Sequence, residues 1–160
     1  MTKLEFFSIK EKPAYTQAIL DSQREHWWAC MPWTEKHMQA CRTPGNLPDT
    51  YVAVADGKPV GTYTLLIKEL LYSKEVGLWI GTLYIFPEAR GWHLTPVLLE
   101  HALRRGAELG YDKMYLASEH VNLYEKFGWL AAGPDLCALG EPTMMYVHHT
   151  IGPVKHAAAA

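Results

Sequence analysis

Apolar and polar residues alternate along the middle of the chain in the period-2 pattern typical of β-strands. Tyr51–Ala55 is followed by the turn residues Asp56-Gly57-Lys58 and then by Val60–Ile67, an order that predicts a β-hairpin. The next run, Val76–Phe86, is apolar on both of its alternating faces. A strand with two apolar faces is expected to be covered on both, so this run predicts the centre of a sheet.

A helical spacing replaces this pattern before the hairpin. Pro13 is well placed as the first residue of a helix that runs to about Cys30. Thr34 is expected to cap a second, shorter helix, Glu35–Cys41, which ends before the turn-rich segment Thr43–Asp49. The N-terminal part of the chain therefore predicts two consecutive helices.

A third helix is predicted after the central strand and the loop Pro87–Leu94. Thr95 is its expected cap, Pro96 suits its first position and Gly110 suits its end. Its apolar residues recur at the spacing of one helical stripe, which predicts that the stripe faces the sheet. The residues of this stripe are Leu98, Leu99, Ala102 and Leu103.

The remaining runs complete the predicted fold. In chain order the elements read β-α-α-β-β-β-α-β-α-β, which predicts an α/β fold with a mixed sheet and helices on both of its faces. No internal repeat or linker interrupts the pattern, so we expect one domain over residues 1–156 and treat the alanines at 157–160 as a disordered tail or a cloning remnant. The further runs are strands at Leu4–Ile9 and Lys113–Ala117, a short helix at Val121–Phe127, and closing strands at Trp129–Ala132 and Thr143–His149.

Composition narrows the class of protein. The 160 residues suffice for one domain with a core, and a net charge of -2 with no basic block argues against nucleic acid as the main partner. The N-terminus lacks the features of a signal peptide, and no window approaches the roughly 18 apolar residues of a membrane span, so we expect a cytoplasmic protein without a membrane partner. Neither a disulfide framework nor a metal site is expected from the spacing of Cys30, Cys41, Cys137, His148, His149 and His156.

The junction between the central strand and the third helix is the first candidate site. A short loop holding Arg90-Gly91 leads directly into the helix start. The first amides of a helix have no partner within the helix, and the helix dipole favours negative charge there. The junction therefore predicts an anion site that suits a pyrophosphate, and the alternative interpretation is a tight turn without a ligand.

Two blocks of sequence resemble the signatures of the GNAT superfamily of N-acetyltransferases. Leu83–Gly91 (LYIFPEARG) is similar to the central strand and loop of that family, usually written V-x-P-x-x-R-G-x-G-x-G/A. Asn122–Trp129 (NLYEKFGW) is similar to its second signature, N…LYEKxGF/W, and the separation of one helix and one strand is also right. Residues 47–53 and 59–62 resemble the first hairpin of the family, so the resemblance covers roughly residues 47–150.

This resemblance implies a fold and a ligand. The fold is a mostly antiparallel sheet in which the central pair of strands splays apart, and the ligand is acetyl-CoA as acetyl donor. Its pantetheine arm would pair with backbone near Leu83 and Ile85 and be held by Asn122. Dimers are common in the family, so the resemblance leaves a homodimer open. The loop residues that would wrap the pyrophosphate are Arg90, Gly91, Trp92, His93, Leu94 and Thr95.

The loop departs from the family pattern near the helix start. His93 and Thr95 stand where the family has its second and third glycines, and Pro96 follows. A left-handed backbone at His93 would cost about 1–2 kcal/mol, and the amide that Pro96 lacks is worth about 1.5–3 kcal/mol as a charge-assisted hydrogen bond. The Thr95 hydroxyl and a protonated His93 could compensate, whereas the other interpretation of His93 is a surface residue without a ligand role. These departures predict a lowered affinity for the cofactor.

Amine acetylation releases a thiolate, which leaves better when it is protonated. The resemblance assigns this proton to Tyr124, since a phenol with a pKa of ~10 can protonate the thiolate of a thiol with a pKa of ~8.5. The alternative is a core aromatic, because Leu123, Tyr124 and Phe127 share helical spacing. The general base stays unassigned among Glu69, Glu75, Glu119 and His120, which lie near strand ends.

The acceptor is specified only as an amine of a small molecule or a peptide. The resemblance places one wall of the acceptor site in the N-terminal helices, where the aromatic cluster is either a pocket for a cation or ordinary helix packing. Three hypotheses remain: an acetyl-CoA-dependent N-acetyltransferase that acts by direct attack in a ternary complex, a non-catalytic acyl-CoA sensor suggested by the altered glycines, and an interaction domain with an exposed tryptophan patch. The cluster comprises His26, Trp27, Trp28 and Trp33.

Overall fold

Seven strands form the sheet of the computed structural model, which describes residues 3–40, 47–70, 73, 75–118, 120, 122–136 and 142–152. They are β1 (Leu4–Ser8), β2 (Asp49–Ala55), β3 (Lys58–Glu69), β4 (Val76–Ile85), β5 (Lys113–Ser118), β6 (Leu130–Leu136) and β7 (Pro142–His149). Hydrogen bonds join them in the order β1-β2-β3-β4-β5-β7-β6. The fourth place of β4 in this order confirms that the run with two apolar faces is a central strand.

The sheet is mixed and mostly antiparallel, as predicted. The pairs β1–β2, β2–β3, β5–β7 and β6–β7 run antiparallel. β4 and β5 instead pair in parallel, at Trp79 and Tyr115. The helices are α1 (Tyr15–His26), α2 (Met31–Ala40) and α3 (Thr95–Glu108), with short 3-10 helices at η1 (Trp28–Cys30), η2 (Pro87–Ala89) and η3 (Tyr124–Phe127).

The chain divides into two compact units. Unit 1 contains Met1–Leu66 and Thr82–Leu98, and unit 2 contains Ile67–Gly81 and Leu99–Ala160. Because these bounds fall inside β3, β4 and α3, each of these three elements contributes residues to both units. The expectation of a single domain stays a prediction.

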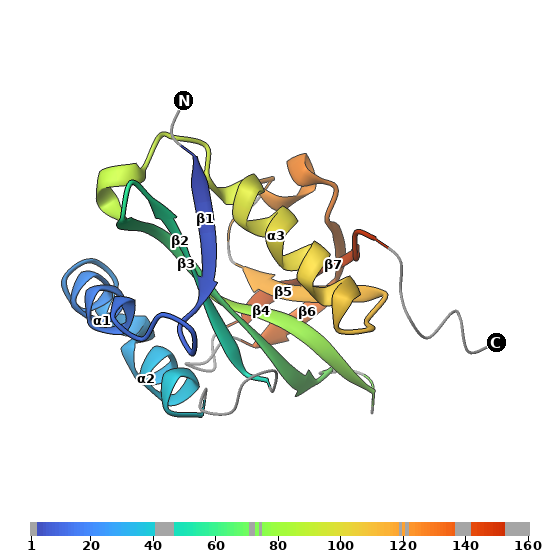
Figure 1. The fold of residues 1–160 in the computed structure, drawn as a ribbon. Coiled ribbons are helices and arrows are strands. Elements are labelled where there is room, and N and C mark those ends of the chain that lie inside the picture. The colour runs from blue at the N-terminus through green and yellow to red at the C-terminus, as the bar shows by residue number, and fades with distance from the viewer. Residues whose placement is uncertain are drawn as a thin grey trace. The chain divides into compact units, whose positions relative to one another are not determined.

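Unit 1 buries side chains on both faces of the β2–β3 hairpin. Helices α1 and α2 lie together on one side of its strands (Figure 1). Alternation along β2 divides the core, because Val52 and Val54 pack with Ile19 of α1, whereas Ala53 and Ala55 belong to the opposite cluster. That second cluster contains Ala89, Leu94 and Leu98, so it holds the segment between β4 and α3 against the sheet.

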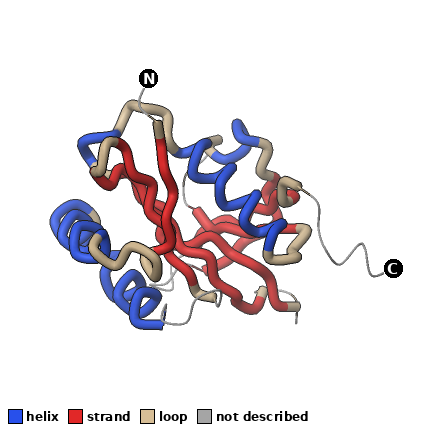
Figure 2. Tube along the Cα trace, viewed as in Figure 1, coloured by secondary structure: helices blue, strands red, loops and turns tan. Residues whose placement is uncertain are grey.

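The turn between β2 and β3 matches its prediction. Asp56 and Gly57 both have left-handed backbones, with φ of 50° and 77°, and the strands resume at Lys58. Two consecutive left-handed residues define the type I′ turn, whose twist suits a two-residue hairpin. The hairpin is visible as two red strands joined by a short tan turn in Figure 2.

Unit 2 packs α3 on the strands through the predicted apolar stripe. Leu99, Ala102 and Leu103 are all buried. Further along the helix, Gly106 permits close contact, because a Cβ atom there would lie 2.8 Å from the Met114 side chain. The predicted helix end is also confirmed: Gly110 has φ of 93°, and its amide donates to the Ala107 carbonyl at 3.0 Å.

The first two helices differ from their predicted bounds. The first begins at Tyr15 rather than Pro13, and it ends at His26 because Trp27 adopts a non-helical backbone with φ of -152°. Thr34 is not a cap but lies buried inside α2, where its hydroxyl donates to Cys30 Sγ at 3.6 Å. The helix starts earlier because η1 leads directly into it. The predicted turn at residues 43–46, together with Cys41 and Cys137, lies outside the described residues.

Two later elements are also shifted. The helix predicted over residues 121–127 is only the single 3-10 turn η3. Thr95 is the first residue of α3 rather than its cap, since the Leu98 amide donates to the Leu94 carbonyl at 2.9 Å. Leu94 therefore occupies the cap position, one residue before the predicted one. Within the part of the chain that the structure describes, no helix is long and apolar enough to cross a membrane.

Candidate active site

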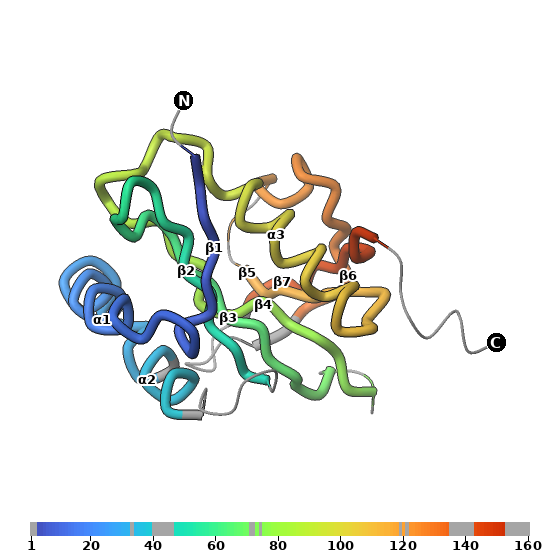
Figure 3. Tube along the Cα trace, viewed as in Figure 1, coloured from blue at the N-terminus to red at the C-terminus, as the bar shows by residue number. Residues whose placement is uncertain are grey.

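The predicted cofactor loop belongs to unit 1 and is anchored at both ends. After β4 the Phe86 amide donates to the Val60 carbonyl at 2.9 Å, and η2 then turns the chain toward α3 (Figure 3). Ala89 and Leu94 are buried in the second core cluster of this unit. Gly61 of β3 lets the helix start approach closely, because a Cβ atom there would lie 3.0 Å from Leu98 Cδ2. The residues between the anchors are thereby held at the surface.

Most amides of this loop are available to a ligand. The Arg90 amide donates to Pro87 at 3.3 Å and the Trp92 amide to Ala89 at 3.2 Å, so both serve the turn itself. Five other amides donate to no group among the described residues, and the first turn of α3 carries no acidic side chain that would occupy its dipole. The loop therefore carries several main-chain donors without a described partner, and their role as an anion site stays a prediction. These amides belong to Gly91, His93, Leu94, Thr95 and Val97.

Two loop residues have left-handed backbones. Gly91 has φ of 90° and His93 has φ of 56°. His93 therefore has the left-handed backbone that the sequence analysis considered. A side chain at this position lowers stability by about 1–2 kcal/mol relative to glycine. The His93 side chain is exposed, and its ligand role stays a prediction.

The Arg90 side chain folds back on β4. Arg90 Nε donates to the Ile85 carbonyl at 3.3 Å, and the guanidinium carbon lies 5.8 Å from the centre of the Tyr84 ring. Leu83 and Ile85 are half-buried and pack against the second core cluster. Their predicted backbone pairing with pantetheine stays a prediction, and the Ile85 carbonyl already accepts the bond from Arg90.

Tyr124 lies in unit 2 and is buried, with 8% of its surface exposed. Its ring lies 5.8 Å from that of Tyr146, and its hydroxyl bonds with the Ser118 side chain. Burial raises the pKa of Tyr124, the Ser118 bond lowers it in part, and Tyr146 raises it further. The phenol therefore stays protonated at neutral pH, which is the state a proton donor needs.

The turn around Tyr124 is specified locally. Gly128 closes η3 with φ of 87°, and the Trp129 amide donates to the Tyr124 carbonyl at 3.2 Å. A Cβ atom on Gly128 would lie 2.9 Å from His148 Nε2, so glycine is required here for space and for backbone. Asn122 is exposed with φ of 60°, a conformation that asparagine tolerates better than most residues. This backbone accounts for Asn122 whether or not it contacts pantetheine.

No general base emerges from the candidates. Glu69, Glu75 and His120 are exposed, and Glu119 lies outside the described residues. The described part of the chain contains no group of three or more His, Cys, Asp or Glu side chains placed to hold a metal ion. His156 and the side chain of Trp33 are not among the described groups.

A cavity of about 710 Å³ opens on unit 1. Helix α1 forms part of its wall, together with the β2–β3 turn and the segment after β4. Two aromatic side chains line it, the buried Phe86 and the loop residue Trp92, which is 54% exposed. Its charged lining is mainly acidic, with Asp21, Glu25, Asp56 and Glu88 against Lys58. The cavity therefore favours a cation with an apolar portion.

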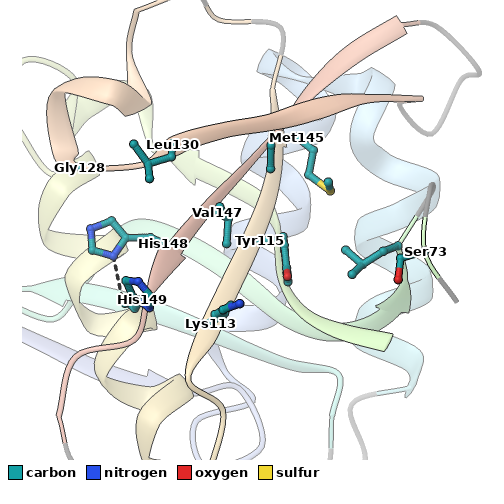
Figure 4. A pocket seen from close by; sticks show the side chains of 11 residues that line it. Ser73, Lys113, Tyr115, Gly128, Leu130, Met145, Val147, His148 and His149 are labelled. Carbon is teal, nitrogen blue, oxygen red and sulfur yellow. Dashed lines mark hydrogen bonds between the residues drawn. The ribbon is translucent and has the colours of Figure 1, made fainter. Parts of the chain in front are cut away.

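A second cavity of about 480 Å³ lies on unit 2 (Figure 4). Side chains of β5, β6 and β7 line it, among them Tyr115, Leu130 and Val147. His148 Nδ1 is hydrogen-bonded to the His149 carbonyl at 2.6 Å at one side of this cavity (Figure 4). Neither Tyr124 nor Asn122 lines it, so we assign it no part in the reaction.

Comparison with known proteins identifies the family. The model of the acetyltransferase (GNAT) family matches residues 14–129, which is more than half of the chain. The chain therefore belongs to the acetyltransferase (GNAT) family, and it is an N-acetyltransferase that takes its acetyl group from acetyl-CoA. No curated protein matches the chain in sequence.

Solved structures share the fold over almost the whole chain. The GNAT family N-acetyltransferase YhbS from Escherichia coli, in complex with CoA, matches with a TM-score of 0.74 and 18% identity over 94% of this chain and 83% of its own. An aminoglycoside 6'-N-acetyltransferase from Enterococcus faecium matches with a TM-score of 0.67 and 16% identity over 94% of this chain and 98% of its own. A variant of the spermidine N-acetyltransferase SpeG from Vibrio cholerae matches with a TM-score of 0.66 and 15% identity over 92% of this chain and 94% of its own. At these identities the likeness shows the fold.

Two neighbours of Tyr124 were not predicted from the sequence. Ser118 and Tyr146 contact Tyr124, and no sequence motif marks either of them.

Thr82, in β4, also has an unexpected backbone. Its φ is 49°, although a β-branched residue in this conformation is strained by about 1–3 kcal/mol. Its hydroxyl donates to Thr64 at 3.3 Å, and Thr64 bonds with Thr50 at 2.7 Å. A run of threonines on neighbouring strands was the available signal for this contact.

Proposed function

We propose that this N-acetyltransferase acetylates a small molecule carrying several amines, an oligoamine. In this proposal the loop from Arg90 to Thr95 holds the pyrophosphate of acetyl-CoA, Tyr124 protonates the departing thiolate, and the acidic cavity of unit 1 receives the ammonium groups that do not react. The acidic cavity is the observation that carries the choice of acceptor.

The loop fits the donor through its main chain. Pyrophosphate needs several convergent donors, and five amides from Gly91 to Val97 have no described partner. Pro96 contributes no amide, yet the neighbouring Thr95 and Val97 amides remain. Acetyl-CoA supplies an activated acetyl thioester when bound. Leu83, Ile85 and Asn122 are proposed to contact its pantetheine arm, on the family resemblance.

Tyr124 is proposed as the general acid. Its raised pKa keeps the proton on the phenol until it is needed. Transfer to a thiolate whose thiol has a pKa near ~8.5 is uphill by at least about 2 kcal/mol, so the hydrogen bond to the developing thiolate matters as much as full transfer. Ser118 positions the hydroxyl for this bond.

The cavity of unit 1 supports an oligoamine as acceptor. Its lining carries four carboxylates and one ammonium, and no described group pairs with the carboxylates of Asp56 and Glu88. Two structures that share the fold are enzymes for aminoglycosides and spermidine, and both substrates carry several amines. Asp21 and Glu25 already lie 3.3 Å from Arg24 and 3.6 Å from His26. A monoamine would leave at least one of the other two carboxylates, Asp56 and Glu88, without a partner.

The test is release of CoA thiol over a panel of amines. Spermidine and kanamycin should give a kcat/KM about 10-fold above that of butylamine or an alanyl peptide, because two extra exposed ion pairs at up to about 1 kcal/mol each allow about 2- to 30-fold. Glu88→Gln combined with Asp56→Asn should remove most of this preference. Glu108→Gln, a charge change on α3 outside the cavity, serves as the control. Equal rates for butylamine and spermidine would refute the acceptor class, and binding of acetyl-CoA without any turnover would support the sensor hypothesis.

A cytoplasmic location and a homodimer belong to the same proposal. Neither follows from the contacts described above. Cell fractionation and light scattering on the purified protein test them directly.

A further inference from the structure

We propose that Tyr84 is a positioning residue that ties helix α1 to the start of the cofactor loop and so fixes two walls of the acidic cavity. This inference rests on the proposed function, because it takes that cavity as the acceptor subsite. Tyr84 lies near the end of β4 in unit 1 and is 4% exposed. Its hydroxyl makes one connection and its ring makes the other.

The hydroxyl connects Tyr84 to α1. Tyr84 Oη donates to the Ser22 carbonyl at 3.2 Å and lies 2.7 Å from Ser22 Oγ, which leaves the serine hydroxyl as the donor of the shorter bond. Ser22 itself lines the cavity, beside Asp21 and in the same helical turn as Glu25. Trp27, which caps α1, stacks on the Tyr84 ring with centroids 6.0 Å apart. The last turns of the helix are thereby held at a set distance from β4.

The ring connects Tyr84 to the loop. The Arg90 guanidinium lies 5.8 Å from the ring centre, within reach of a cation–π contact, and Arg90 Nε is fixed by the Ile85 carbonyl. Arg90 directly precedes the open amide of Gly91, and Trp92 lines the cavity. The position of the ring therefore sets where the loop begins.

Packing alone does not explain a tyrosine at this position. Phe86 lies on the same face of the chain, belongs to the same core cluster and meets the Tyr84 ring edge-on at 5.5 Å. A phenyl ring thus suits this face without a hydroxyl. What the hydroxyl adds at position 84 is the pair of hydrogen bonds to Ser22.

The hydroxyl is tested with Tyr84→Phe, which keeps the ring. KM for spermidine should rise at least about 5-fold, since two hydrogen bonds to Ser22 of about 0.5–1.5 kcal/mol each are lost, while kcat and the Kd of acetyl-CoA change less than 2-fold. Ser22→Ala should raise the same KM in the wild type but not in the Tyr84→Phe background, because the serine acts through the tyrosine. A Ser22→Ala effect of equal size in both backgrounds would overturn this half of the proposal.

The ring is tested by binding of acetyl-CoA in a calorimeter. Tyr84→Leu and Arg90→Met should each raise the Kd about 3- to 5-fold and together no more than either alone, whereas additive effects would overturn the link. If Tyr84→Leu does not fold, Arg90→Met is measured in the wild type and in Tyr84→Phe. Because both keep the ring, its effect must then be the same in both, and a different effect overturns the link.

Amide hydrogen exchange separates this proposal from the proposed function. Tyr84→Phe should raise exchange several-fold in the last turn of α1, whether or not any oligoamine reacts. If the wild type does not acetylate oligoamines but the variant loosens α1, the acceptor is wrong and the Tyr84 link stands. If oligoamines react and exchange in α1 is unchanged, the link is wrong.

Discussion

The cofactor loop and the turn around Tyr124 present their functional groups in opposite ways. The loop presents main-chain amides, and its side chains at Trp92 and His93 are exposed. The turn presents one buried side chain, held by Ser118 and Tyr146. Main-chain donors depend on the path of the backbone rather than on residue identity, whereas a phenol has no substitute among neutral side chains with a similar pKa. The loop can therefore differ from the family pattern without losing its donors, and the turn cannot.

The largest effect is expected when the buried Tyr124 side chain is replaced. Tyr124→Phe should lower kcat by about 100-fold or more, the low end for loss of a positioned general acid, and should leave the Kd of acetyl-CoA within 2-fold. Steady-state kinetics and calorimetry measure the two quantities. Tyr146→Phe, which changes the neighbouring ring in the same way, is the control and should lower kcat only a few-fold. A Tyr124→Phe enzyme with the wild-type rate would remove Tyr124 from the chemistry.

A smaller effect is expected when one main-chain amide of the loop is removed. Thr95→Pro removes one amide at a helix position that accepts proline, and it should raise the Kd of acetyl-CoA about 10-fold, since a charge-assisted hydrogen bond is worth about 1.5 kcal/mol or more. Thr95→Ala keeps the amide and loses only the hydroxyl, so its effect should stay below about 3-fold. Equal effects of the two variants would mean that the side chain rather than the main chain binds the anion.

The backbone path of the loop is tested at His93. Because His93 has φ of 56°, His93→Gly should raise the free energy of unfolding by up to about 1 kcal/mol, and His93→Val should lower it by about 1–2 kcal/mol. Urea denaturation followed by circular dichroism measures both. A stable His93→Val variant would contradict the left-handed backbone.

The smallest effect concerns pH. Burial raises the pKa of Tyr124 above the value of the unfolded chain, so the fold favours the neutral phenol. Its contribution to stability is complete below about pH 10 and is lost as the pH rises through the raised pKa. Urea denaturation at intervals above pH 9 should show a shallower decline for Tyr124→Phe than for the wild type, and parallel declines would contradict the shift.

The sequence predicted the parts of the fold that repeat a simple pattern. The apolar faces of Val76–Phe86 placed β4 at the centre, and Asp56-Gly57 located the hairpin turn, because local chemistry alone determines both. Thr34 shows where such reasoning fails: a good capping residue lies inside a helix when tertiary packing favours a longer one. The identity of the residue does not reveal that its hydroxyl bonds with Cys30 instead.

Sequence motifs indicated the main residues of the candidate site but not the side chains that contact those residues. Arg90-Gly91 was a candidate from the strand-to-helix junction and from the family resemblance, and Tyr124 was a candidate from the resemblance. Ser118 and Tyr146, by contrast, reach Tyr124 only after β5 and β7 pair, a contact between residues distant in sequence. The same holds for Ser22 and Tyr84, which are 62 residues apart. Side-chain partners across a sheet or a helix face leave no local trace in the sequence.

Trp92 lies between two open main-chain amides of the loop, and its side chain lines the acidic cavity. Its own amide is used in the turn. If the proposed function holds, heritable variation at this codon would change the preference for the molecule to be acetylated while leaving the binding of the acetyl carrier unchanged. In a lineage exposed to new amines, that position offers a route to altered selectivity by a single substitution.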